Sequence, residues 1–241
     1  MKHLNRNTSR LNSQGLQTKT AVTVVRRMPG IPKRAMCPTP DPATLAHLRS
    51  LTRATRRLWR DLEISPCALA PRHEEHSNRV GFFSLRIAHA LGLGKEQCQR
   101  IYRAAYLHDV GGLAVSQAIL RKHGALTAAE RAAMQVHPFI SCQLLGAFLS
   151  TEDLAGIVLS HHERYDGHGY PNGLEGTKIP LEARVLAIAD SLDAMMSRRP
   201  YRETLAPADA QVELRREAGH QFDPSIVETL VRQGELVAMT K

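Results

Sequence analysis

A histidine and an aspartate, His108 and Asp109, stand side by side directly after an apolar stretch that ends at Leu107. Adjacent side chains on a helix point about 100° apart, so two neighbours share a ligand only where a helix ends or distorts. An imidazole nitrogen and a carboxylate oxygen together suit Zn²⁺, Mn²⁺ or Fe²⁺. Five further potential metal ligands lie with this pair in a span of 115 residues: His76, His137, His161, His162 and Asp190.

The whole set comprises five imidazoles and two carboxylates at the ends or inner faces of successive helical segments. Helical bundles build dinuclear metal centres by projecting ligands inward from different helices. One Zn²⁺ needs three or four such groups, whereas seven suffice for two ions that share a bridging carboxylate. Two ions about 3.5–4 Å apart can clamp a phosphoryl group and activate the attacking water. This ligand set therefore indicates phosphoester hydrolysis.

The elements that must position these residues are predicted to be helices, because apolar residues recur at helical spacing almost throughout the chain beyond His73. Gly92 and Gly94 end the first helix, and Thr127-x-x-Glu130 has the pattern of a capping box. Long helices are expected over residues 73–91, 96–108, 137–148, 181–196, 207–218 and 224–233. No alternating strand pattern of useful length appears, so the fold is predicted to be all-α.

The net charge of +9 is unevenly distributed along the 241 residues. Residues 1–60 contain 13 Lys and Arg against one acid and carry a formal +12, which leaves −3 for the remainder. We expect a basic, disordered extension over 1–40 and a basic amphipathic helix over 41–65, ahead of the site-bearing domain at 66–241. A solvated tail is favoured over nucleic-acid contact, because aromatic residues are not interleaved. A natural start at Met28 or Met36 is the third alternative.

Several classes of protein are excluded by composition. No apolar run approaches the ~18 residues that span a membrane, and the first residues lack the apolar core of a secretory signal. The four cysteines are scattered at spacings that suggest no disulfide pairing, which is typical of a protein in a reducing cytoplasm.

The basic helix predicted over 41–65 could pack on the domain, pair with itself in a homodimer or contact another protein.

The string from His161 to Pro171, HHERYDGHGYP, resembles the HHE and GYP motifs of the HD-GYP family, which are bacterial cyclic di-GMP phosphodiesterases among the HD metal-dependent phosphohydrolases. The likeness covers roughly residues 70–235 and includes HSNRV from His76, ADSLDA from Ala189, RPYR from Arg199 and GHQFDP from Gly219. It implies a helical bundle of the HD-domain type with a glycine-rich GYP loop, and hydrolysis of cyclic di-GMP to pGpG or on to GMP.

Positions carried over from this resemblance imply two metal ions. One is expected on His76, His108, Asp109 and Asp190, and Asp109 also bridges to a second ion on His137, His161 and His162. Asp109 and Asp190 are the expected catalytic carboxylates, with Asp190 or a neighbouring ligand orienting the attacking water. Fe or Mn is favoured over Zn, since the ligands are rich in histidine and carboxylate.

The resemblance also implies substrate contacts. Arg199 and Arg202 fall where the family places cations on the substrate phosphates, although a solvated cluster beside Arg198 is the plainer interpretation. Gly169, Tyr170 and Pro171 shape the loop, and Tyr170 offers a stacking face. In the family this loop is linked to substrate access or to contact with a diguanylate cyclase partner.

Two departures from the family pattern limit these expectations. The lysine of the family's HDxGK motif is replaced by Gly112, and losing such a phosphate contact costs about 10²–10³ in rate unless Arg121, Lys122 or another cation compensates. Arg72 stands where some members have a glutamate for a third metal, so two metals are predicted. The alternatives are therefore a catalytically weak module that binds nucleotide or protein, and a hydrolase for another cyclic dinucleotide or nucleotide.

Overall fold

The computed structural model describes residues 73–147, 151–197 and 204–234, so the predicted basic extension and the predicted basic helix lie outside the described residues. The α-helices are α3 (His73–Ala90), α4 (Lys95–Leu107), α5 (Gln117–Leu120), α6 (Ala128–Met134), α7 (His137–Gly146), α8 (Ala155–Leu159), α9 (Leu181–Met196), α10 (Pro207–Arg216) and α11 (Pro224–Arg232). Three short 3₁₀ turns accompany them: η2 (Val110–Ala114), η3 (Glu152–Leu154) and η4 (Gly176–Lys178). Over these ranges the chain forms isolated β-bridges but no strand.

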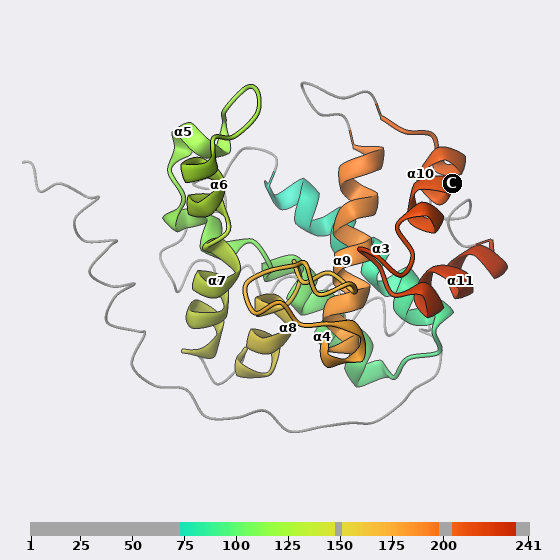
Figure 1. The fold of residues 1–241 in the computed structure, drawn as a ribbon. Coiled ribbons are helices and arrows are strands. Elements are labelled where there is room, and N and C mark those ends of the chain that lie inside the picture. The colour runs from blue at the N-terminus through green and yellow to red at the C-terminus, as the bar shows by residue number, and fades with distance from the viewer. Residues whose placement is uncertain (1–72, 148–150, 198–203, 235–241) are drawn as a thin grey trace, which may run out of the picture.

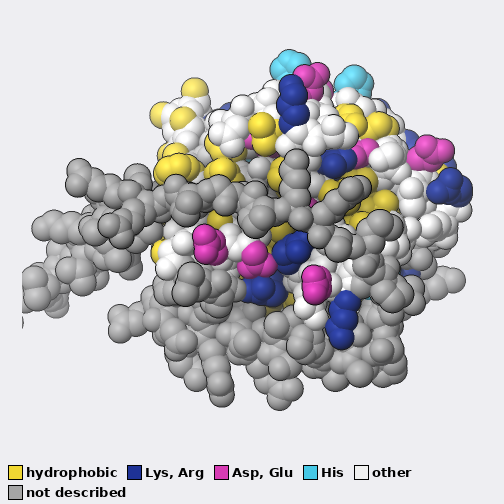
Figure 2. Space-filling model, turned by 90° about the horizontal axis from the view of Figure 1, so that it is seen from below, with side chains coloured by type: hydrophobic (Ala, Val, Ile, Leu, Met, Phe, Trp, Pro, Cys, Tyr) yellow, Lys and Arg dark blue, Asp and Glu magenta, His cyan; other side chains and the backbone are white. Residues whose placement is uncertain are grey.

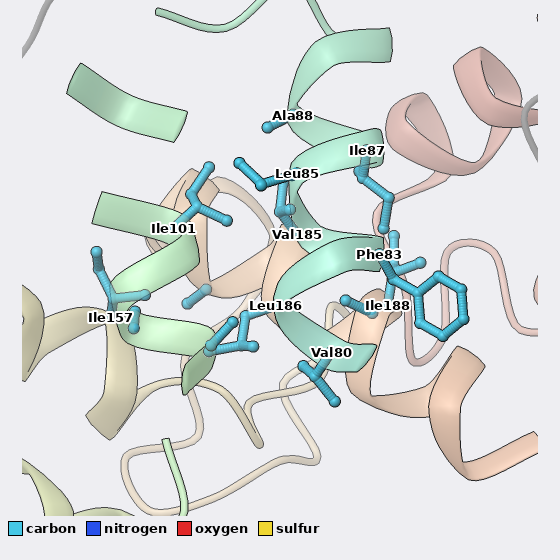
Figure 3. Packing of buried hydrophobic residues seen from close by; sticks show 14 of the residues in the cluster. Val80, Phe83, Leu85, Ile87, Ala88, Ile101, Ile157, Val185, Leu186 and Ile188 are labelled. Carbon is cyan, nitrogen blue, oxygen red and sulfur yellow. The ribbon is translucent and has the colours of Figure 1, made fainter. Parts of the chain in front are cut away.

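Helix α9 runs through the middle of the molecule and packs against α3 and α4 (Figure 1). The short helices α5 and α6 stand with α7 on one side of it, and α10 and α11 stand on the other (Figure 1). Figure 3 shows the apolar faces of α3, α4, α8 and α9 meeting in one core, where Ile87, Ile101, Leu186 and Ile188 are fully buried. This central packing fixes the helix ends from which the candidate ligands project.

Local sequence signals account for several helix boundaries. Thr127 and Glu130 form the predicted capping box at the start of α6, which confirms that expectation. Gly92 adopts a φ of 65° just after α3, a left-handed conformation that favours glycine and ends the helix. Asp223 caps α11 by accepting a hydrogen bond from the Ser225 amide.

The surface of the described residues carries mixed charge. Figure 2 shows acidic and basic side chains interspersed on the visible, described part of one face. The strong positive charge of the sequence lies instead in its first 60 residues. Among the helices that the structure describes, none combines the length and the apolar character needed to cross a membrane.

Candidate metal centre

The His-Asp pair lies where α4 gives way to the turn η2. His108 is the C-cap of α4, and Asp109 directly precedes η2. A Cβ atom at Gly111 would lie 2.2 Å from the carbonyl oxygen of His137, so only glycine lets η2 approach α7 this closely. The Ser141 hydroxyl donates to the His108 carbonyl at 2.7 Å and accepts from the Gly111 amide at 2.8 Å. The end of α4 at this point and the two hydrogen bonds of Ser141 together place His108 and Asp109 against α7.

Three of the seven predicted ligands form a first cluster, contributed by α3, by the end of α4 and by α9. Potential ligand atoms of His76, His108 and Asp190 lie within 4.8 Å of one another. The Nε2 atom of His76 is 3.3 Å from Nε2 of His108 and 3.5 Å from Oδ1 of Asp190. Side chains that are 114 positions apart in sequence thus meet at one point.

A second cluster unites the start of α7 with the segment that follows α8. Potential ligand atoms of His137, His161 and His162 lie within 4.8 Å of one another. The Nε2 atoms of His137 and His161 are 3.4 Å apart. All three imidazoles therefore turn toward a common point.

The carboxylate of Asp109 lies between the two clusters and presents one oxygen to each. Its Oδ2 atom is 3.4 Å from Nε2 of His108, and its Oδ1 atom is 3.2 Å from Nε2 of His137. This placement is the one that a bridging ligand requires.

The tautomers of four histidines follow from their hydrogen bonds. Three of them direct Nδ1 at the backbone carbonyl three residues earlier: His108 at Ala105 (2.7 Å), His137 at Met134 (2.8 Å) and His161 at Val158 (2.6 Å). A carbonyl only accepts, so the proton resides on Nδ1 and the lone pair of Nε2 faces the cluster.

His76 is oriented differently, because it sits inside a helix whose carbonyls are already used. Its Nδ1 atom donates to Oδ2 of Asp193 at 2.7 Å. Asp193 is buried and also accepts hydrogen bonds from Arg79 and from the Ser197 hydroxyl. Sequence reasoning missed this role of Asp193, although the spacing Asp190-x-x-Asp193 places both carboxylates on one face of α9.

The electrostatics of the clusters favour a cation. Burial opposes a charged imidazole, yet Asp109 and Asp190 raise the pKa of His108 to about 9. Burial and the surrounding imidazoles hold the pKa of His161 well below its ordinary value, and burial lowers the pKa of His162 to about 4. The carboxylates thus favour positive charge beside His108, while burial keeps His161 and His162 neutral, with an unprotonated ring nitrogen available to a cation. Divalent cations fit this donor set of nitrogen and oxygen atoms.

The predicted GYP loop packs on the HHE segment. The ring of Tyr170 lies 4.9 Å from that of His162, with an interplanar angle of 32°. Sequence reasoning missed the anchor of this loop, the buried Glu163, whose carboxylate accepts from the amides of Asn172 (2.7 Å) and Leu174 (3.0 Å). Its signal was its place directly after the two histidines. Of the remaining predicted substrate residues, Gly169 and Pro171 flank Tyr170 in this loop, whereas Arg199 and Arg202 lie outside the described residues.

A cavity of about 310 Å³ opens beside the second cluster. His161, His162 and Asp190 lie on its wall, together with Tyr170 and Gln221.

Two cations were considered as substitutes for the family lysine: Lys122 is engaged in an ion pair and Arg121 is exposed. The Lys122 ammonium is 2.5 Å from the Glu130 carboxylate. Gly112 itself is buried in η2.

Comparison with known families and proteins agrees with this architecture. The HD domain family matches residues 64–226, well over half of the chain. A cyclic di-GMP phosphodiesterase response regulator, RpfG, of Xanthomonas campestris pv. campestris is 45% identical over 148 residues, which cover 61% of this chain and 39% of that protein. A cyclic di-GMP phosphodiesterase of Thermotoga maritima is 39% identical over 65% of this chain and 43% of its own length. A 3′3′-cGAMP-specific phosphodiesterase of Vibrio cholerae is 37% identical over 65% of this chain and 30% of its own length.

Solved structures give the same fold. An HDG"Y"P protein from Bdellovibrio bacteriovorus matches with a TM-score of 0.56 at 19% identity, over 78% of this chain and 60% of that one. A cyclic GMP-AMP-specific phosphodiesterase of Vibrio cholerae matches with a TM-score of 0.53 at 18% identity, over 72% and 48% of the two chains. The chain belongs to the HD domain family, and the predicted all-α bundle and the HD-GYP resemblance are confirmed. It spans less than half the length of the curated relatives named above.

Proposed function

We propose that this chain is a metal-dependent phosphodiesterase that hydrolyses cyclic di-GMP to pGpG, and further to GMP. The observation that carries the proposal is Asp109, whose two oxygens face two separate clusters of imidazoles. The names of the relatives point to cyclic dinucleotides as the class of substrate. Cyclic di-GMP is favoured, because it is the substrate named for the relative that is 45% identical.

In this proposal, His76, His108 and Asp190 hold one divalent cation, the second cluster holds another, and both share Asp109. Two such cations supply Lewis acidity toward phosphate oxygens and lower the pKa of water. Mn or Fe is favoured over Zn, because two carboxylates accompany the imidazoles. Asp190 lies both in the first cluster and on the cavity wall, where it can orient the attacking water.

The chain's other residues bind and orient the substrate. The cavity beside the clusters admits a phosphodiester linkage of the dinucleotide, and Tyr170 and Gly169 form part of its wall. Arg199 and Arg202 remain the proposed phosphate contacts, because a guanidinium fork matches phosphate oxygens. The division at residues 40 and 65, and a diguanylate cyclase as a partner of the GYP loop, likewise remain proposals.

Gly112 favours a second candidate, a domain that binds the nucleotide but cleaves it slowly. Glycine supplies no charge at the position of the family lysine, and Lys122 is engaged with Glu130. The loss of one stabilising contact to developing charge costs about 10²–10³ in rate. The two candidates therefore share the metal centre and differ in turnover.

Turnover of cyclic di-GMP by anaerobically purified protein, with bound metal quantified in the same sample, tests the proposal. The variant His108→Ala/Asp109→Ala should bind less metal and lose cleavage. The matched control, His123→Ala/Asp209→Ala, removes the same two residue types at exposed positions and should retain both. Two bound metals per chain without cleavage would refute the diesterase and favour the binding domain. Gly112→Lys, which restores the family lysine, should then bring cleavage up to a measurable rate, because the lost contact accounts for about 10²-fold in rate.

A further inference from the structure

The imidazole of His162 differs from the four others in how its ring is held. His76 donates Nδ1–H to a carboxylate, and the other three histidines donate theirs to backbone carbonyls. Within the described part of the chain, neither ring nitrogen of His162 has a hydrogen-bond partner. A metal-binding histidine almost always has its second nitrogen fixed by a partner, which sets the tautomer and the orientation. Something else must orient this ring.

Aromatic packing supplies the missing restraint. The ring of His162 lies 4.0 Å from that of His161 and 5.0 Å from that of His137, both of which belong to the same cluster. The third ring against it, Tyr170, comes from outside the cluster, at 4.9 Å and an interplanar angle of 32°. The small angle makes this a tilted stack, in which one ring limits the rotation of the other.

Tyr170 can act as a restraint because its own backbone is fixed. Its amide donates to the His162 carbonyl at 3.2 Å. A Cβ atom at Gly169 would lie 2.2 Å from the Arg164 amide nitrogen, so the loop backbone is in direct contact with the HHE segment. Beyond Pro171, the Glu163 carboxylate holds two more amides of the loop. The loop is thus tied on both sides of the tyrosine.

We infer that Tyr170 is a positioning residue that holds the His162 ring in its ligating orientation by stacking, in the place of a hydrogen bond. The inference rests on the proposed function, in which His162 binds the cation of the second cluster. In this inference the GYP loop has a structural role within the domain, because it helps to form the second cluster of the metal centre. This role requires the aromatic ring of Tyr170 and does not require its hydroxyl group.

A Co²⁺ titration of the metal-stripped chain of 241 residues, followed by calorimetry and by the visible absorption of Co²⁺, tests this inference. Wild-type protein should bind two ions per chain. Tyr170→Leu should bind the first ion as wild type does and the second about 10–100-fold more weakly, the range for loss of an orienting partner. Tyr170→Phe keeps the ring and should restore the second ion. Tyr165→Leu, the same change elsewhere in the loop, should leave both ions in place.

The outcomes separate the inference from the proposed function. Fewer than two ions on the wild-type protein would overturn both, because His162 would then not be a ligand. Two ions on the wild type and equally tight binding to Tyr170→Leu would overturn the inference alone. A loss of the second ion from Tyr170→Phe as large as that from Tyr170→Leu would also overturn it, since the hydroxyl would then matter. Retained affinity for the first ion in Tyr170→Leu shows that the variant is folded.

Discussion

Asp193→Asn should weaken cation binding at the first cluster by about tenfold without unfolding the protein. Asp193 accepts from Nδ1 of His76 at 2.7 Å, from the Ser197 hydroxyl at 2.7 Å and from Arg79. Its side chain is only 2% exposed, so water screens these contacts little. Asparagine keeps the shape and one acceptor but removes the negative charge that polarises the imidazole.

The magnitude follows from the kind of hydrogen bond that changes. A hydrogen bond to a charged group contributes about 1.5–3 kcal/mol and a neutral one about 0.5–1.5 kcal/mol, so the exchange loses roughly 1–1.5 kcal/mol. About 1.4 kcal/mol corresponds to a tenfold change in affinity. Asp193→Ala removes the acceptor altogether and leaves the Nδ1–H of His76 unpaired, which should extend the loss toward about 100-fold. Arg79 is 41% exposed, so water moderates the cost of leaving its charge alone.

Co²⁺ binding, measured by absorption and calorimetry, gives the affinity of each ion. Spectra of His76→Ala and His162→Ala after one equivalent identify which cluster each variant has lost, and Asp193→Asn should resemble His76→Ala. Ser197→Ala is the matched control, because it removes a hydrogen bond from Asp193 Oδ1 while Oδ2 still holds His76. The reasoning is refuted if Asp193→Asn binds both ions as wild type does, or if it weakens the two clusters equally.

Two further predictions concern stability. Gly111→Ala places a Cβ atom 2.2 Å from the His137 carbonyl oxygen, so it should destabilise the fold by about 1–3 kcal/mol in urea unfolding; an unchanged midpoint would contradict the close packing of η2 on α7. Burial raises the pKa of Asp223, but hydrogen bonds from Ser225 and Arg184 outweigh burial and hold that pKa below its ordinary value. Its stabilising effect is therefore present above about pH 4 and is lost as the pH falls toward the folded pKa. Asp223→Asn should lower stability at neutral pH and flatten the decline below pH 4, and parallel curves for the two proteins would contradict this.

Local features of the fold could be predicted from the sequence, because they depend on residues that are close together along the chain. The capping box predicted at Thr127 is present in the structure. The helix expected at 181–196 has the same first and last residues as α9. The segment from Asp153 to His161 has the apolar spacing of one short helix, but in the structure it divides into η3 and α8, which ends before Ser160. Apolar spacing alone does not distinguish a 3₁₀ turn from an α-helix.

The site was predicted as a set of residue types, and the structure brings all seven together. The sequence does not reveal the surrounding residues that orient these seven side chains through hydrogen bonds and packing. Asp193 reaches His76 across 117 positions, and Ser141 reaches Gly111 across 30. Such contacts depend on how helices pack, which spacing within one helix does not specify. Arg199 and Arg202 stay predictions.

The carbonyls that hold His108, His137 and His161 belong to the last turns of α4, α6 and α8. Carbonyls of a last turn have no partner within their own helix. Each of these imidazoles is therefore also the cap of a helix, and one hydrogen bond serves both chemistry and folding. Removing such a histidine uncaps a helix even when no metal is present. The architecture thus makes these three histidines part of the fold as well as of the proposed metal centre, so their substitution should lower stability in the metal-free protein too.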